Sequence, residues 1–197
     1  MPIQTQLYVP IQGVELPIIP DVSLRGKNLY EAQLHAQNNG LAILGSPDIN
    51  TVARAVRPKR PSKKFIGYAR EKTDLGDKDV TDAYGQLHDQ IWKQCWVRAR
   101  EILVRQSPAY PRIISGEPDP RVRADLPFYS SLITPKMAEL LGAPENTYVW
   151  TNADPQSDKG LKVLDWELCA RGRPKLYSIW GLGSRNFCNG YLLGRKS

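Results

Sequence analysis

Cysteine is scarce in this sequence. Three cysteines occur among 197 residues, at Cys95, Cys169 and Cys188. An odd number at such wide spacing fits neither a disulfide framework nor a zinc-binding pattern, and it suits a reducing compartment. We therefore expect a cytoplasmic protein without a bound metal.

Long apolar runs are missing as well. The mean hydropathy is −0.44, and no stretch approaches the roughly 18 apolar residues that cross a bilayer. The first fifteen residues lack the basic segment and the apolar run of a secretory signal. The sequence thus predicts a chain with neither a membrane span nor a secretory signal.

Few residues offer catalytic chemistry. His35 and His88 are the only histidines, and both lie in expected helices, where a structural role is commoner than that of a general base. The Gly181–Gly183 stretch lacks the lysine of a nucleotide-binding loop. We expect no enzyme and no cofactor. One alternative is a metal-dependent nuclease, because Asp165 and Glu167 would project from one face of a strand; in the other interpretation these carboxylates balance neighbouring arginines.

Acidic residues are outnumbered by basic ones. The chain has 27 Lys and Arg against 20 Asp and Glu, a net charge of +7 and a pI near 9.4. This balance favours a polyanionic partner. The densest cluster of basic residues contains no acidic residue, and Pro58 and Pro61 within it argue against a helix. Its members are Arg54, Arg57, Lys59, Arg60, Lys63 and Lys64. It is interpreted either as an arm that contacts phosphates or as a solvated loop.

Hydrophobic spacing predicts an α+β fold, with short strands and helices around one long amphipathic helix. Short helices are expected over Asn28–Asn38 and from Ser46 to about Val56, and a strand over Lys64–Ala69. Apolar residues at three- and four-residue steps predict the long helix over Asp79–Arg105, with Trp92 and Trp96 beside its apolar stripe.

These elements suggest three segments. Residues 1–70 hold a proline-rich arm and the basic loop, residues 71–121 hold the long helix and a proline-rich connection, and residues 122–197 hold a C-terminal unit with a basic tail.

The C-terminal unit has an ordered series of elements. A helix is expected over Thr134–Gly142, where the glycine adopts a positive φ, and a second helix starts at Asn146. Two alternating strands follow, and a basic turn that includes Arg171 and Arg173 joins them.

The motif residues Met137–Thr147 and Gly172–Ile179, with Gly160-Leu161 between them, resemble a winged helix-turn-helix DNA-binding domain over about residues 125–183. The resemblance implies a second helix that enters the major groove and a hairpin tip that rests on phosphates. The Arg171–Pro174 stretch also resembles the core of an AT-hook, whose arginines lie in narrow minor grooves.

The resulting expectation is non-enzymatic binding of double-stranded DNA by a transcription or replication regulator, located in the nucleoid or within a particle. The expected contact residues are Lys136, Asn146, Thr147, Thr151, Asn152, Arg171, Arg173, Lys175, Arg57, Lys59, Arg60, Lys63 and Lys64. The alternative is an assembly subunit of a nucleoprotein or virion-like particle whose proline-rich arms bind neighbouring copies. A homo-oligomer fits either hypothesis.

Overall fold

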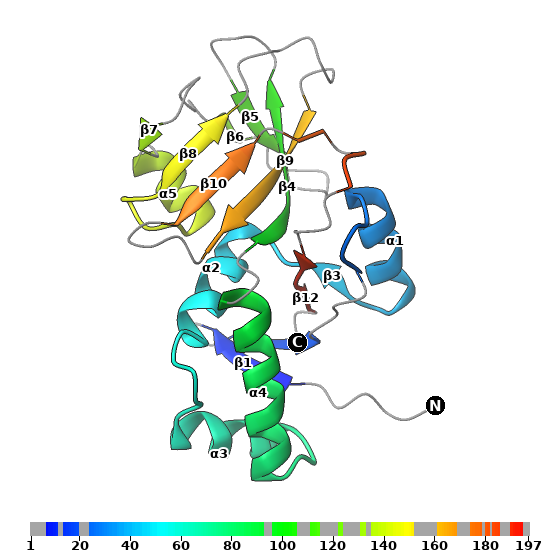
Figure 1. Cartoon of the computed structure of the whole chain (residues 1–197), viewed down its shortest axis with the longest axis vertical. Coiled ribbons are helices and arrows are strands. Elements are labelled where there is room, and N and C mark those ends of the chain that lie inside the picture. Colours follow the sequence, from blue (N-terminus) through cyan, green and yellow to red (C-terminus); the bar gives the residue numbers. More distant parts are fainter. Residues whose placement is uncertain are drawn as a thin grey trace.

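Two sheets and five helices make up the described part of the chain (Figure 1). The computed structural model describes residues 7–11, 14–19, 24–92, 96–105, 111–114, 122–123, 131–132, 135–151, 161–168, 174–178, 180–181, 183–185 and 190–194. For some of these, including the first two strands, only the backbone is described. The mixture of helices and strands confirms the α+β class.

The helices are α1 (Leu29–Asn38), α2 (Ser46–Ala55), α3 (Lys63–Lys72), α4 (Asp77–Trp92) and α5 (Pro135–Leu141). The strands are β1 (Leu7–Ile11), β2 (Val14–Ile19), β3 (Ala42–Ile43), β4 (Trp96–Arg105), β5 (Pro111–Ile114), β6 (Val122–Arg123), β7 (Ser131–Leu132), β8 (Tyr148–Thr151), β9 (Leu161–Glu167), β10 (Lys175–Ser178), β11 (Gly190–Tyr191) and β12 (Leu193–Gly194).

The larger sheet has the order β6-β5-β4-β9-β10-β8-β7, with β11 beside β4, and the smaller sheet has the order β1-β2-β12-β3. Two pairs are parallel, β8 with β10 and β4 with β11. The larger sheet combines strands from residues 71–121 and 122–197, and the smaller one combines strands from both ends of the chain. The three segments expected from the sequence are therefore interleaved.

The helices over 28–38, 46–56 and 134–142 are confirmed as α1, α2 and α5. Asn28 caps α1 in a capping box with Glu31. Gly142 has a φ of +58° at the end of α5, as the sequence predicts. The two C-terminal strands are confirmed as β9 and β10, which pair antiparallel.

The prediction of one long helix over Asp79–Arg105 is wrong in its second half. Helix α4 ends at Trp92, and residues 96–105 form the strand β4. The apolar stripe is confirmed only as far as Ile91. Beyond it, Val97 and Ala99 alternate with charged side chains along the chain, and this two-residue period belongs to a strand.

The prediction of a strand over Lys64–Ala69 is also wrong, because these residues lie in α3. The Ser62 hydroxyl accepts the backbone N–H of Phe65 and caps the helix. Ala69 is buried, and Phe65 and Ile66 pack against the same cluster at helical spacing. The aromatic and β-branched residues suggested a strand, but the cap and this packing face favour a helix.

The prediction of a second helix in the helix-turn-helix is wrong as well. Residues Tyr148–Thr151 form β8, which pairs parallel with β10 and antiparallel with β7. Its sequence, Tyr-Val-Trp-Thr, consists of aromatic and β-branched residues that suit a pleated strand.

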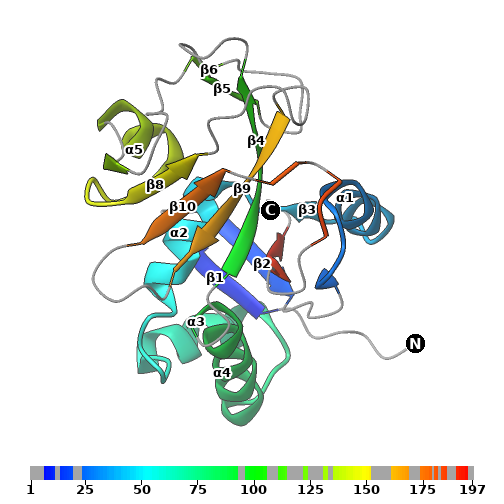
Figure 2. The ribbon, with the colours of Figure 1, turned by 45° about the horizontal axis from the view of Figure 1, so that its top comes forward.

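Two buried clusters hold these elements together. The larger one lies between the helices α2, α4 and α5 and one face of the larger sheet, and its sheet residues include Val97, Val149, Leu164, Trp166 and Leu176. The smaller one joins α1 to β3, β9, β11 and β12. In Figure 1 α5 lies behind β8 and β10, and in Figure 2 α2 lies behind β10 and β9.

Candidate nucleic-acid interface

Residues 54–64 link α2 to α3 and are called the basic connection below. All six of its cationic side chains are exposed: Arg54, Arg57, Lys59, Arg60, Lys63 and Lys64. Within the part of the chain that the structure describes, none of the six forms an ion pair with a carboxylate. Their charges are therefore available to an external anion.

The backbone of the basic connection is anchored on α4. The Tyr84 hydroxyl donates to the carbonyl oxygen of Pro58 at 2.8 Å, and His88 Nδ1 donates to that of Val56 at 2.8 Å. The Arg57 guanidinium lies 6.0 Å from the centre of the Trp92 ring. These contacts hold the backbone while the cationic side chains extend outward, which lowers the ordering cost of binding. Sequence analysis missed this anchor; its only signal was the i, i+4 spacing of Tyr84 and His88.

The first turn of α3 carries charge of the unfavourable sign. Lys63 and Lys64 occupy that turn, and it contains no acidic residue. The N-terminal end of a helix has a partial positive charge, so cations there are destabilising and anions are stabilising. An anion bound beside Lys63 and Lys64 would relieve this repulsion.

The structure describes the side chains of four residues expected from the winged-helix resemblance: Lys136, Asn146, Thr147 and Lys175. Lys136 is exposed on α5, and Asn146 is exposed in the turn before β8 rather than in a helix. Thr147 is fully buried, so the expectation that it contacts DNA is wrong. Asn152, Arg171 and Arg173 lie outside the described residues, as does the side chain of Thr151.

Lys175 opens β10, and its Nζ lies 3.6 Å from Glu167 Oε2. Glu167 also accepts a hydrogen bond of 2.9 Å from the Tyr177 hydroxyl. Burial and this carboxylate raise the pKa of Tyr177 to about 12, so the hydroxyl stays protonated at neutral pH.

Asp165, the other half of the candidate metal pair, is fully buried. Its two oxygens accept hydrogen bonds of 2.7 and 3.0 Å from Arg98 Nε and Nη2. Asp165 and Glu167 therefore balance cationic side chains. This agrees with the second of the two interpretations of this pair in the sequence. Among the described residues, no three His, Cys, Asp or Glu side chains gather as a metal site requires.

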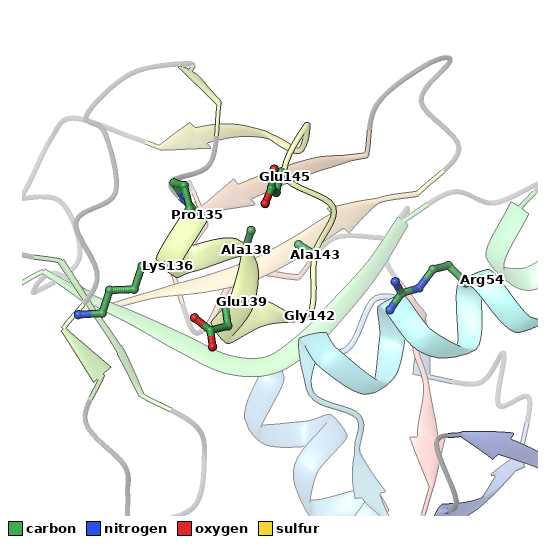
Figure 3. A pocket seen from close by; sticks show the side chains of 8 residues that line it. All are labelled: Arg54, Pro135, Lys136, Ala138, Glu139, Gly142, Ala143 and Glu145. Atoms are coloured by element: carbon green, nitrogen blue, oxygen red, sulfur yellow. The ribbon is translucent and has the colours of Figure 1, made fainter.

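An open depression of about 640 Å³ lies between α2 and α5 (Figure 3). It brings Arg54 of the basic connection and Lys136 of α5 to one lining, but Glu139 and Glu145 line it too. Two cations and two carboxylates leave no net charge, so this depression does not extend the positive surface.

Comparison of the chain with known family models, curated proteins and solved structures gave no match. None of the described helices has both the length and the apolar character needed to cross a membrane.

Proposed function

We propose that this protein binds nucleic acid through its phosphate backbone and that the basic connection is the contact surface. The observation that carries the proposal is the set of six exposed cations that have no carboxylate partner among the described residues, on a backbone anchored by Tyr84 and His88. Phosphate contacts by such side chains supply most of the affinity in non-specific binding of nucleic acid.

The sequence predicted double-stranded DNA as the ligand; we keep the broader class, nucleic acid, and assign a different means of contact. A regulator of the winged-helix type would read bases with a recognition helix, and the chain has β8 in its place. Contacts to phosphates position a protein on its ligand without reading the sequence. We therefore assign the basic connection a role in affinity.

The test is a salt titration of fluorescently labelled DNA, both duplex and single-stranded, followed by fluorescence anisotropy. The variant replaces Lys59, Arg60 and Lys63 with glutamine. If all three touch phosphates, the affinity falls and the salt slope shrinks by up to about 2.7 on duplex or about 2.1 on a single strand.

A matched control removes the same charge elsewhere by replacing Arg70, Lys72 and Lys78 with glutamine. Arg70 and Lys78 are already paired with Asp77 and Asp82. Their loss should change the slope much less. Equal losses in both variants would show a general effect of net charge, and a parent that binds neither polymer at low salt would end the proposal.

A further inference from the structure

The face of the larger sheet opposite α2 and α5 carries a row of partly exposed side chains. Backbone pairing aligns Tyr148 of β8 with Lys175 of β10, Lys175 with Glu167 of β9, and Glu167 with Trp96 of β4. All four are partly exposed. Successive residues of a strand point to opposite faces, so these four share one face.

The neighbouring row confirms this assignment. It contains Val149, Leu176, Trp166 and Val97, which are at most 2% exposed and belong to the cluster that packs against α2, α4 and α5. The row with Tyr148 and Trp96 therefore points away from α2 and α5. Among the described helices, none lies in front of β8 and β10 in Figures 1 and 2. Farther along β9, Val163 is on the same face and is buried in the smaller cluster with α1.

Tyr177 extends the aromatic part of this face. It lies two residues after Lys175 on β10, and its ring centre is 4.7 Å from that of Trp96 with an interplanar angle of 47°. We call Tyr148, Tyr177 and Trp96 the aromatic face. Partly exposed rings on a sheet are platforms on which bases stack, and stacking accepts every base because every base has a π-face.

Among the described residues of this face, Glu167 is the partly exposed carboxylate, and it does not repel a polyanion at full strength. Glu167 is paired with Lys175 and accepts from the Tyr177 hydroxyl. Asp165, in the next row on the same face, is buried against Arg98. Lys175 and Glu167 therefore leave no net charge beside the rings, and Asp165 is held by Arg98.

The aromatic face and the basic connection lie close together along the chain path. Arg57 of the connection contacts the Trp92 ring, and Trp92 precedes Trp96 by four residues. Four steps of about 3.8 Å place their Cα atoms at most about 15 Å apart. A single strand of several nucleotides is long enough to span this distance.

We propose that the aromatic face stacks the unpaired bases of single-stranded nucleic acid while the basic connection holds its phosphates. A duplex keeps its bases stacked inside, so only a single strand can use both surfaces. This inference rests on the proposed nucleic-acid function and names its ligand as single-stranded.

The experiment compares binding of oligo(dT) of about 15 nucleotides, within the range of site sizes for stacking proteins, with binding of a duplex of the same length. The parent should bind oligo(dT) more tightly. Tyr177→Ala should weaken oligo(dT) binding by about 5- to 150-fold and leave duplex binding within about twofold. Tyr177→Phe keeps the ring and should bind like the parent.

Tyr30→Ala is the matched control, because Tyr30 is 60% exposed on α1, outside the aromatic face. It should leave both affinities unchanged. Trp96→Ala is a second variant, and circular dichroism shows whether each variant is folded. A folded Tyr177→Ala that binds oligo(dT) like the parent overturns the inference, as does an equal loss on both polymers.

The two proposals fail in different ways. If the parent binds both polymers with the same affinity, and only the variant of the basic connection weakens them, the stacking inference falls and the proposed function stands. If the parent binds neither polymer, the proposed function falls as well.

Discussion

Glu101 is a carboxylate in the core with an identifiable task. Its exposed fraction is 8%, and both of its oxygens accept the backbone N–H of Ser46, at 2.7 and 2.9 Å, in the first turn of α2. The Ser46 hydroxyl donates to Glu101 and in turn accepts from Trp166 Nε1. A negative charge at this end of a helix is favourable, so β4 supplies a cap that the sequence next to α2 does not.

Gly45 is the residue that makes room for this cap. A Cβ at that position would lie 2.6 Å from Glu101 Oε1. Its φ of −76° is ordinary for any residue, so the glycine is required by the close approach of the carboxylate rather than by backbone strain. The sequence predicted a helix that begins at Ser46, and in the structure Gly45 occupies the cap position and Ser46 is the first residue of the helix.

The first prediction concerns the pH dependence of stability through Glu101. Burial raises the pKa of this carboxyl above its ordinary value of 4.5, although the hydrogen bonds from Ser46 oppose the shift. The folded chain then holds the proton more tightly than the unfolded chain, so this contribution to stability is present below pH 4.5 and is lost as pH rises through the raised pKa. Glu101→Gln cannot titrate and should lack that loss.

Urea unfolding of the parent and of Glu101→Gln between about pH 4 and pH 8 would measure this pH-dependent contribution of Glu101 to stability. The unfolding free energy of the parent relative to Glu101→Gln should decline across the window and then level off. Parallel curves would mean that the hydrogen bonds from Ser46 cancel the effect of burial, and a relative gain by the parent as pH rises would mean that they outweigh it.

At the scale of elements, α3 has a helix cap of ordinary chemistry and a first turn of the wrong charge. Ser62 satisfies the N–H of Phe65, yet Lys63 and Lys64 add cations where the helix end is already positive. Stability alone would favour acids at these two positions. We interpret the lysines as residues maintained for binding, and this interpretation makes opposite predictions for stability and for affinity.

The second prediction uses that opposition. Lys63→Glu with Lys64→Glu should raise the unfolding free energy by a few tenths to about 1 kcal/mol per residue at low ionic strength. The same variant should bind nucleic acid more weakly. Thermal unfolding and anisotropy on the same samples measure both. A variant that is destabilised, or that binds as well as the parent, contradicts the argument.

Elements also show what the sequence could and could not predict. Helices α1 and α5 were predictable because the cap residue Asn28 and the glycine Gly142 mark their ends locally, and α2 because a proline stands in its first turn. The change from α4 to β4 was not, because Ile91, Cys95 and Ile102 continue a helical spacing by coincidence. The basic connection was visible as a charge cluster. The aromatic face was not, because only strand pairing brings Trp96 and Tyr177 together.

At the scale of the whole molecule, Arg98 joins parts of the chain that are far apart in sequence. It is 1% exposed, forms two hydrogen bonds with Asp165 of β9, and donates to the carbonyl oxygen of Ser184 at 2.9 Å. The paired carboxylate outweighs burial and raises the pKa of Arg98, so the guanidinium stays charged. A buried ion pair costs desolvation that its attraction only partly repays.

The third prediction separates the net contribution of this ion pair to the unfolding free energy from the loss that follows when only one partner is removed. Arg98→Met leaves the Asp165 carboxylate buried without its cation and should lower the unfolding free energy by roughly 3–5 kcal/mol, a large part of the ~5–15 kcal/mol that a domain has. Adding Asp165→Leu removes the stranded charge and should recover most of that loss, because apolar replacements of buried ion pairs are often neutral or stabilising.

Urea unfolding of the single and double variants measures the coupling between the two positions, and Lys78→Met serves as the control. Lys78 is 86% exposed and paired with Asp82, and its loss should leave the unfolding midpoint unchanged because water screens such pairs. If the double variant is as unstable as the two single losses combined, Arg98 and Asp165 contribute independently. The hydrogen bond from Arg98 to Ser184, rather than the ion pair, would then account for the contribution of Arg98 to stability.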